Sequence, residues 1–598
     1  MDPPAGEAQD APPHSNNHIG SPIQEEGPHQ EPLTSSSSSS SAATPAGPTR
    51  EKAATPAWQP TSRPPQRDQA GIRTRELPPQ SKHHSRGRKV PVCRSKATLL
   101  HPAQPGTSLA TLAFFFIVLA LLLDFTKRRR SWSRYPPGPP SLPFFGNILQ
   151  ADVKHFPEYC NKLRKKYGDV FSFQFCWDNV VIINGLESVK EGLITKSEDT
   201  SDRPYFPITD CYVYKENCAG MVLAKYGQSW KEVRRFSLST LRDFGLGKKS
   251  LEERVMEEAE FLCSALKSKS GSPFDPYLML NNAVSNVICS IIFGDRFEYD
   301  DKKFLTVMRL FEDIIKTTGE LLPQLVNVVP ALVHIPGVKQ KIFRAHNKLF
   351  DFLRGVIAEH KEGWDPNVKR DFIDAFLEKV EQVKGDPSSS FNEPNLFLTV
   401  VDLFTAGSGT TSTTLRFGLL YMILYPNLQI RVQEEIDQVI GRERQPTMDD
   451  RANMPYTSAV LNEIQRCGDI LPLSVPHMTS RDTEIHGFFI PKGTTLMFNL
   501  TSILKDESIW ENPYQFYPEH FLDADGQLIK RDAFMPFSAG RRVCLGEQMA
   551  KMNLFLFFTS IFQKFTFHIP RDQPRPSEMA TGGTIRAPLP YQLCVEVR

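Results

Sequence analysis

A cysteine near the C-terminus, Cys544, lies in a setting suited to a thiolate that binds a metal-bearing group. It stands between Gly540 and Gly546, with Arg542 two residues before it and a helix-forming run after it. A thiolate is stabilised at the positive N-terminus of a helix, and the glycines allow a tight turn and a close helix approach. Phe537 can shield one side of the sulfur, and Arg542 can reach a carboxylate. These residue types predict a thiolate held against a flat, anionic, metal-bearing partner.

A cysteine taken alone is more often a buried structural residue, but the neighbours of Cys544 favour a metal ligand. A haem with an axial thiolate satisfies each feature, and a thiolate pushes electron density toward O–O cleavage. Residues 537–546 match the pattern Phe-x-x-Gly-x-Arg-x-Cys-x-Gly. From about Tyr135 onward the chain resembles the cytochrome P450 family. The resemblance implies haem b, bound through Cys544 as iron ligand, with Phe537 and Gly546 beside it.

A second chemical candidate lies in the predicted long helix Asn392–Tyr425. Two glycines and three consecutive hydroxyl residues fall between Gly407 and Ser412, and glycine and hydroxyl residues are poor helix formers. Their hydroxyls can bond back to carbonyls and make room for water; the alternative is close packing of small residues. The resemblance implies the family's oxygen-activation helix, with Gly407, Thr410 and Thr411 as catalytic residues and Thr410 guiding protons to dioxygen.

The chain departs from the family pattern at Gly409, where most members carry an acid. Proton delivery is then expected to depend on Thr410 and ordered water. Some catalytically competent members of the most similar subfamily also lack the acid, so monooxygenation remains the predicted reaction. Two other functions stay open. Gly409 favours a haem-thiolate isomerase or lyase that rearranges peroxides without a reductase, and the unusual N-terminal region favours a non-catalytic membrane haem protein.

Dispersed donors suit the carboxylates of a haem. Trp230 and Arg234 fall on one helix face at i,i+4, and both an indole N–H and a guanidinium donate to carboxylates. Taken singly, each is an ordinary surface or core residue. The resemblance implies that the two propionates are bound by Arg203, Trp230, Arg234, His477 and Arg542, with Ser538 as an additional donor.

A charged pair, Glu463 and Arg466, shares one helix face at i,i+3. Such pairs are common surface salt bridges. The resemblance implies a buried structural triad of Glu463, Arg466 and His520 that supports the haem loop, with His520 in place of the commoner arginine.

Basic residues are expected on the thiolate side of the haem. Lys231, Arg235 and Arg541 would attract an acidic redox partner, or would simply form a solvated basic face. The resemblance implies NADPH–cytochrome P450 reductase as partner, with cytochrome b5 as a second one.

The stretches 246–250, 297–301, 477–482 and 555–560 resemble family 2, subfamily D, most closely. Mammalian members are drug-metabolising, and some favour lipophilic amines through pocket carboxylates. Asp402 falls on one of these carboxylates, or is structural and bonds backbone N–H groups. The other falls on Thr318, with Glu320 two residues on. By the same resemblance, further walls of an apolar pocket are Val222, Ala406, Leu471, Val475 and the turn Thr581–Ile585.

The composition bounds the class of protein. The chain has 598 residues and a net charge of +2, and this near balance does not suggest nucleic-acid binding. Its ten cysteines show no CxxC pair, so neither a disulfide framework nor a zinc site is indicated and a reducing compartment fits.

The N-terminal part predicts a membrane anchor behind a long extension. Residues 1–96 are rich in Pro, Ser, Gln and Ala and are expected to be disordered. Gly106–Leu123 is just long enough to cross a bilayer core of roughly 30 Å, although a buried core helix is the alternative. Basic residues 127–130 would stop transfer, and prolines in 135–140 would form a stiff hinge. The extension is interpreted as an atypical or misassigned first exon.

These segments predict a disordered extension (1–105), a transmembrane anchor (106–126), a basic stop with a proline hinge (127–150) and a catalytic domain (151–598). The anchor type resembles endoplasmic reticulum members with a cytosolic catalytic domain, although the basic residues at 82–96 leave the orientation open on charge alone.

The catalytic domain is predicted to be mainly α with small β-sheets (α+β), the prism fold of the resembled family. Strand-like runs occur at 170–175, 180–184 and 483–490. The implied activity is insertion of one oxygen atom of O₂ into lipophilic molecules such as xenobiotics, amines, fatty acids or steroids, with NADPH-derived electrons.

Overall fold

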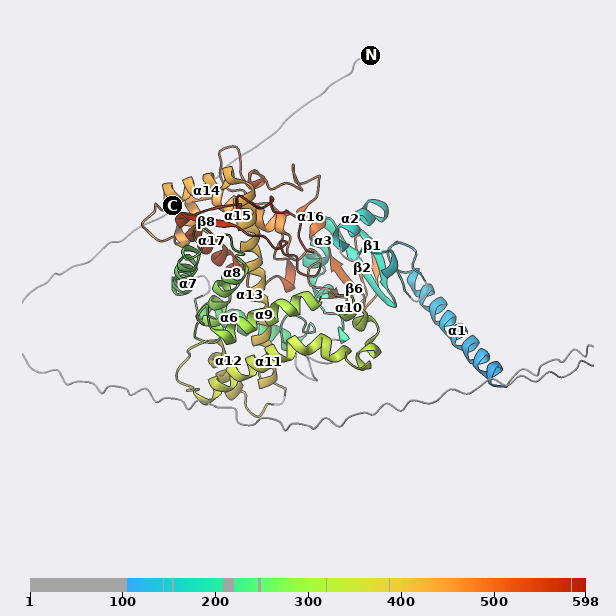
Figure 1. Ribbon diagram of the computed structural model, residues 1–598. Coiled ribbons are helices and arrows are strands. Elements are labelled where there is room, and N and C mark those ends of the chain that lie inside the picture. Colours follow the sequence, from blue (N-terminus) through green and yellow to red (C-terminus); the bar gives the residue numbers. More distant parts are fainter. Residues whose placement is uncertain are drawn as a thin grey trace, which may run out of the picture. The chain divides into compact units, whose positions relative to one another are not determined.

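The computed structural model describes residues 105–598, apart from 143–144, 153–154, 208–219, 246–248, 319, 387 and 582 (Figure 1). Apart from its last residue, Pro105, the predicted extension lies outside the described residues. The bounds of the four predicted segments stay predictions.

Helix α1 (Pro105–Trp132) contains the predicted anchor. Its stretch Leu109–Lys127 is long and apolar enough to cross a membrane. Apolar side chains such as Phe114 and Leu123 are exposed, which a core helix would not show. The helix continues past Leu123 through the basic cluster at 127–130.

The proline segment after α1 is packed against the first strand. The Ser172 N–H donates to the Pro137 carbonyl at 3.0 Å. Gly138 lies so close that a Cβ there would be 2.0 Å from the Ser172 carbonyl oxygen. The segment predicted as a stiff hinge is thus part of the packed structure.

The remainder is mainly helical. The longer helices are α2 (Phe156–Tyr167), α6 (Gln228–Asp243), α7 (Lys249–Lys267), α8 (Tyr277–Ile292), α9 (Lys302–Thr318), α10 (Leu321–Val328), α11 (Val338–Glu362), α12 (Phe372–Gln382), α13 (Glu393–Leu424), α14 (Pro426–Val439), α15 (Pro455–Gly468) and α17 (Glu547–Lys564). The short ones are α3 (Leu186–Lys190), α4 (Ser197–Thr200), α16 (Thr501–Leu504), η1 (Ile148–Gln150), η2 (Glu191–Thr195), η3 (Pro330–His334), η4 (Met448–Asn453), η5 (Pro518–Phe521) and η6 (Gly540–Arg542).

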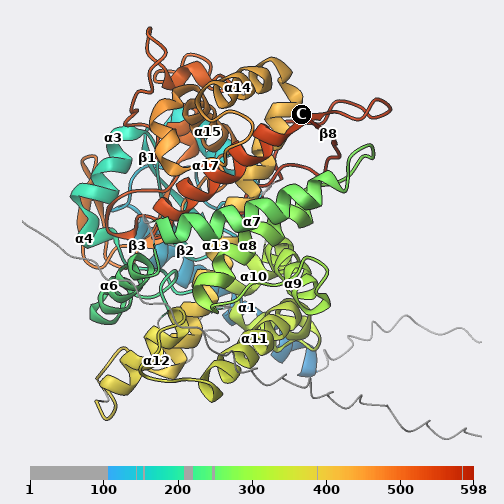
Figure 2. The same ribbon diagram turned by 90° about the vertical axis from the view of Figure 1, so that its left-hand side faces the viewer.

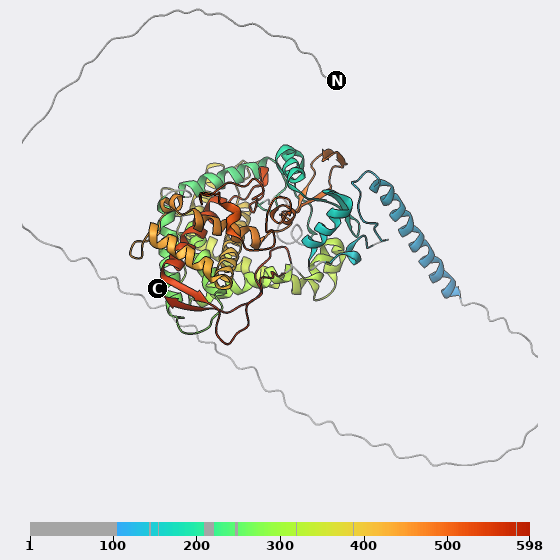
Figure 3. The same cartoon turned by 90° about the horizontal axis from the view of Figure 1, so that it is seen from above.

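The strands form small sheets, as predicted. The largest has the order β1-β2-β6-β3, from β1 (Val170–Phe175), β2 (Asp178–Ile183), β6 (Thr495–Phe498) and β3 (His477–Met478). Near the C-terminus, β7 (Phe565–His568) pairs with β8 (Cys594–Val597) (Figure 3).

The predicted strand-like run 483–490 is not one continuous strand. Residues 483–490 form two strands, β4 (Thr483–Ile485) and β5 (Phe488–Ile490), paired as a hairpin. Both turn residues, His486 and Gly487, have positive φ angles of 52° and 76°. Such a turn reverses the chain between paired strands, and the apolar pattern on both sides had hidden it.

Helix α13 runs through the core and contacts α8, α15 and α17, and α7 packs against α8 and α17 (Figure 2). The Asn392 side chain caps it by accepting from the Asn395 N–H at 2.9 Å. It ends at Leu424, before Tyr425 and Pro426, because a residue preceding proline avoids the helical region. Both ends lie one residue inside the predicted range Asn392–Tyr425. Most of its residues are buried, so the accessible residues on it are candidates for contact with a ligand.

Candidate functional site

The loop 537–546 is folded so that Cys544 is exposed while its surroundings are packed. The Cys544 N–H donates to the Phe537 carbonyl at 3.0 Å and closes the loop. Gly540 has a φ of 73°, and a Cβ there would lie 1.7 Å from the Leu193 carbonyl oxygen. Only glycine meets both conditions. A Cβ on Gly546 would lie 3.9 Å from the Cys544 sulfur, so this glycine lies directly beside it.

The electrostatic surroundings of Cys544 act in both directions. Although the side chain is accessible, the protein packed around it desolvates the thiol and raises its pKa. The Gly546 N–H lowers the pKa, the Glu547 carboxylate raises it and the Arg234 guanidinium lowers it, and the net shift is upward. Because metals bind deprotonated cysteine, coordination to a metal cation would make the thiolate the stable form.

The predicted carboxylate-binding donors converge on the Cys544 loop. Trp230 Nε1 and Arg542 Nη1 both donate to the Met221 carbonyl at 3.2 Å. The Arg542 guanidinium carbon lies 4.1 Å from the Trp230 ring centroid. Arg234 donates to the Val543 carbonyl at 2.5 Å. Helix α6 and the cysteine loop are thereby joined by the residues that the sequence singled out.

Two further predicted donors join this cluster from other segments. Arg203 Nη1 donates to the Val475 carbonyl at 2.9 Å, and its Nε to the Val222 carbonyl at 3.0 Å. His477 Nδ1 donates to the Thr200 carbonyl at 2.8 Å. Burial, then the nearby Arg203 and Arg542 charges, holds the pKa of His477 far below its usual range. His477 is therefore neutral here.

The cluster carries buried positive charge paired with dipoles. Within the described residues, Arg542 donates to the carbonyls of Ser201, Met221 and Ala224. Burial lowers the pKa of Arg542 to about 10 despite the neighbouring Asp202 carboxylate, and burial also lowers the pKa of Arg234. Desolvated guanidinium groups bind carboxylates strongly, so the donor set suits an anion such as a propionate.

Ser538 lies at the same loop in a strained conformation. Its φ is 61°, in the left-handed region of the backbone that residues other than Gly, Asn and Asp rarely adopt. Its hydroxyl is buried and has no hydrogen-bond partner within the described residues. An orphan hydroxyl is costly unless a ligand or water pairs with it, which agrees with the predicted donor role.

Near its middle, helix α13 has accessible residues among mostly buried ones. Ala406 is exposed and Thr410 is half-buried, whereas Ser408, Gly409 and Thr411 are buried. The Thr410 hydroxyl donates back to the Ala406 carbonyl at 2.8 Å in an exposed position. This back-bonding was predicted, and it places the hydroxyl on the accessible face of the helix.

Gly407 is set by packing. A Cβ there would lie 2.6 Å from Ile288 Cδ1 on α8, so the small-residue alternative holds for this position. The catalytic role of Gly407 remains a prediction, as does that of the buried Thr411.

Asp402 is engaged with the main chain. Its Oδ2 accepts from the Met221 N–H at 2.6 Å and from the Val222 N–H at 2.9 Å, and the residue is 7% exposed. This contact fits the structural reading of Asp402, and it links α13 to the segment that also receives Trp230 and Arg542.

The other positions considered for binding a substrate amine, Thr318 and Glu320, add no contact that supports such a role for Asp402. Thr318 ends α9, and its side chain lies outside the described residues. Glu320 is exposed and pairs with Lys341 Nζ at 3.5 Å. Val222, Leu471 and Val475 are half-buried, as expected of walls that face an accessible space.

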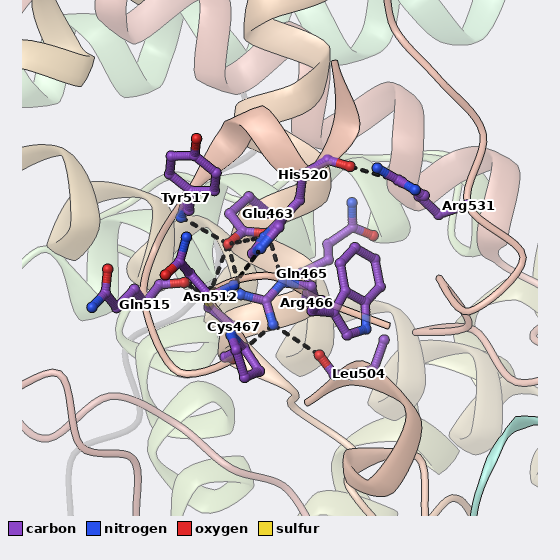
Figure 4. Close-up of polar contacts among 12 residues, drawn as sticks. Glu463, Gln465, Arg466, Cys467, Leu504, Asn512, Gln515, Tyr517, His520 and Arg531 are labelled. Atoms are coloured by element: carbon purple, nitrogen blue, oxygen red, sulfur yellow. Dashed lines mark hydrogen bonds and ion pairs between the residues drawn. The ribbon is translucent and has the colours of Figure 1, made fainter. Parts of the chain in front are cut away.

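The predicted structural triad is assembled and buried (Figure 4). Arg466 donates to both carboxylate oxygens of Glu463 at 2.7 Å, and both side chains are fully buried. His520 Nδ1 lies 3.3 Å from Glu463 Oε1, and its Nε2 accepts from the Asn512 N–H at 3.2 Å. The Tyr517 N–H also donates to Glu463 at 2.8 Å.

The predicted basic face is partly assembled. Lys231 Nζ and the Arg541 guanidinium lie 5.0 and 5.9 Å from the ring centroid of the same residue, Tyr226. Arg235 is exposed on the same helix as Lys231. Arg541 also pairs with Glu198 at 3.6 Å, which neutralises part of this surface.

Comparison with known proteins decides the family. The cytochrome P450 family model matches residues 136–595. The chain belongs to the cytochrome P450 family. It is 52% identical to cytochrome P450 2D4 of Rattus norvegicus and to cytochrome P450 2D15 of Canis lupus familiaris, each over 495 residues, which are 82% of this chain and 99% of each relative. It is also 52% identical to cytochrome P450 2D6 of Homo sapiens over 493 residues, again 82% of this chain and 99% of the relative.

As a cytochrome P450, the protein is a haem-thiolate monooxygenase that uses haem b, O₂ and NADPH-derived electrons. The residues present fit this cofactor, since an accessible cysteine sulfur adjoins buried cationic donors that are suited to its carboxylates. Bound haem supplies the iron at which dioxygen is activated. In this P450, Cys544 would hold the iron, and Arg203, Trp230, Arg234, His477 and Arg542 would hold or support the propionate side.

Residue types alone did not reveal one member of the cluster. Met221 receives Trp230 and Arg542 at its carbonyl and donates its N–H to Asp402. These contacts involve only the main chain of Met221, so no side-chain type at that position could have signalled them.

Proposed function

We propose that this cytochrome P450 is a drug-metabolising monooxygenase of the endoplasmic reticulum membrane, with its catalytic domain in the cytosol. It inserts one oxygen atom of O₂ into lipophilic small molecules. Electrons come from NADPH–cytochrome P450 reductase, with cytochrome b5 as a second donor. The observation that carries the proposal is the convergence of the predicted haem-binding side chains on the Cys544 loop. The similarity to 2D relatives and the apolar helix α1 support it.

Reconstitution tests the reductase and its docking face together. With purified reductase and NADPH, the protein is expected to oxidise at least one of lauric acid, testosterone and propranolol. The double variant Lys231→Glu, Arg235→Glu should slow the first electron transfer by about tenfold at low ionic strength, because charge attraction accelerates association. Stopped-flow reduction measures this rate.

The control for this experiment is Lys369→Glu, which reverses a charge at an exposed position elsewhere. Equal rates for the double variant and the wild type at all salt concentrations would contradict docking at Lys231 and Arg235. Peroxide rearrangement without NADPH consumption would instead identify an isomerase or lyase.

Within this reaction, Thr410 is proposed to position the water that delivers protons. Thr410→Ala should lower product formation by roughly a hundredfold while NADPH consumption continues, because electrons are then lost as hydrogen peroxide. Thr410→Ser should restore most of the product yield. The measurement is the ratio of product to NADPH consumed.

A matched control is Thr414→Ala. Its hydroxyl donates to the Thr410 carbonyl at 3.0 Å, the same kind of back-bond, but the residue is buried. If both alanine variants uncouple NADPH consumption equally, helix distortion rather than proton delivery is responsible.

Asp402 is proposed to order the 221–222 segment rather than to bind amines. Asp402→Asn keeps an oxygen that can accept both N–H groups, so the KM for cationic propranolol and for neutral testosterone should change by the same factor. Asp402→Ala should destabilise the protein by about 1–3 kcal/mol, measured by thermal unfolding. A rise of about tenfold in KM for propranolol alone in Asp402→Asn would show that the carboxylate binds the amine.

A further inference from the structure

The segment Asp469–Val475, which carries the proposed pocket residues Leu471 and Val475, has a strained residue near each end. Asp469 has a φ of 43° and Ser474 a φ of 58°. Left-handed backbone at such residues persists only where neighbouring contacts hold it. The Leu500 N–H donates to the Pro472 carbonyl at 2.7 Å and supplies one such contact.

The Asp469 carboxylate makes a second set of contacts that hold the wall 469–475 in place. Its side chain is 1% exposed, and its Oδ2 accepts from the Thr501 hydroxyl at 2.5 Å. Arg586 Nη1 lies 3.4 Å from the same oxygen and 3.1 Å from Glu158 Oε1 on α2. A buried carboxylate needs such a cation nearby.

Arg586 also bonds the wall through its main chain. Its N–H donates to the Ile470 carbonyl at 2.9 Å, next to the residue that its side chain contacts. Arg586 thus bonds to two successive residues of the wall, Asp469 and Ile470, and its side chain is only 15% exposed.

Arg586 directly follows the second proposed wall, the turn Thr581–Ile585. The turn is closed on itself, because the Thr581 N–H donates to the Ala587 carbonyl at 2.8 Å and the Ala587 N–H donates to the Thr581 hydroxyl at 3.1 Å. Ala580 and Pro588 are bridged just outside it. These contacts hold the two ends of the turn together, and Arg586 at its base connects it to the wall at 469–475.

We propose that Arg586 is a positioning residue that fixes the spacing between the wall 469–475 and the turn 581–585, and thereby selects which carbon of a lipophilic substrate is oxidised. The proposal rests on the proposed function, since it assigns these two segments as walls of the substrate pocket. Arg586 need not touch substrate. Its guanidinium acts through Asp469, so removal of either partner should shift the same property.

The test compares Arg586→Met, Asp469→Asn and the double variant with the wild type, each reconstituted with reductase on lauric acid, testosterone and propranolol. Arg586→Met keeps the apolar stem and removes the charge. We expect KM to rise by about tenfold and the ratio of oxidised positions on each accepted substrate to change at least twofold. The change in the double variant should be smaller than the sum of the changes in the two single variants, because both single variants remove the shared Arg586–Asp469 contact.

The matched control is Arg571→Met, an exposed arginine in the same C-terminal region. Each variant is first checked for the reduced CO spectrum of thiolate-ligated haem. If Arg586→Met does not fold, Arg586→Lys replaces it and should give a smaller shift in the same direction. Product ratios and KM equal to those of Arg571→Met would overturn the proposal. A wild type that lacks the spectrum or any NADPH-dependent product would overturn the proposed function instead.

Discussion

Cys544→Ala is expected to lose the strongly red-shifted Soret band of the reduced, CO-bound protein and to reduce monooxygenation to background. The cysteine sulfur is the thiolate ligand in our proposal, and alanine offers no ligand to iron. The protein should remain folded, because Cys544 is exposed and its N–H bond to the Phe537 carbonyl does not need the side chain. The absorbance spectrum and NADPH-dependent product formation measure the effect.

Cys594→Ala is the matched control, since this cysteine is half-exposed on β8, outside the haem-binding loop. It should keep both the band and the activity. If Cys544→Ala retained the red-shifted band, another group would have to be the axial ligand and the assignment of the whole site would fail.

Glu463→Ala is expected to destabilise the protein by about 3–5 kcal/mol, because it leaves the fully buried Arg466 guanidinium without its counterion. The same change should weaken haem retention, since Glu463 also receives the Tyr517 N–H and faces His520 on the segment that leads to the haem loop. Thermal unfolding and the rate of haem loss during dilution measure the two effects.

The control for Glu463→Ala is a neighbouring exposed pair. Glu519 accepts from Arg431 at 2.7 Å, with side chains 32% and 49% exposed. Glu519→Ala should cost less than about 1 kcal/mol. If Glu463→Ala and Glu519→Ala lost similar free energies of unfolding, burial of the Glu463–Arg466 pair would not explain the effect. Glu463→Leu with Arg466→Met should recover part of the loss, because no uncompensated charge remains.

The contribution of the Glu463–Arg466 pair to stability is expected to fall at low pH. Burial alone would raise the pKa of Glu463, but the Arg466 and His520 hydrogen bonds outweigh it and hold the pKa below its ordinary value of 4.5. A carboxylate with a lowered folded-state pKa stabilises the protein above its unfolded-state pKa, and loses this contribution as the pH falls through the folded value. The stability difference between wild type and Glu463→Ala should therefore shrink below about pH 4.

Sequence reasoning succeeded where side-chain type and spacing carry the information. The mainly helical fold with small sheets and the family are confirmed. Strand Val170–Phe175 and the long helix α13 appear within the expected bounds because apolar periodicity and end signals agree there. Residues far apart in sequence, such as Arg203 and Arg542, were placed at one site by the family pattern.

The parts that could not be predicted depend on main-chain geometry or on tertiary approach. The turn at His486–Gly487 splits an apolar run into a hairpin. The anchoring of the proline segment to Ser172 requires knowledge of which strand lies beside it. Arg586 drew no attention in the sequence because a lone arginine near the C-terminus has no distinctive spacing. The roles of the site residues remain predictions that the variants above test.

The histidine in the Glu463 cluster has a consequence for charge balance. Because His520 Nε2 accepts an N–H from Asn512, the proton must be on Nδ1, and the imidazole is neutral. The buried cluster then holds one cation and one anion, whereas an arginine at position 520 would leave a surplus positive charge in a dry interior. This chain therefore keeps the support beneath its haem loop electrically neutral, so that added salt should barely affect it.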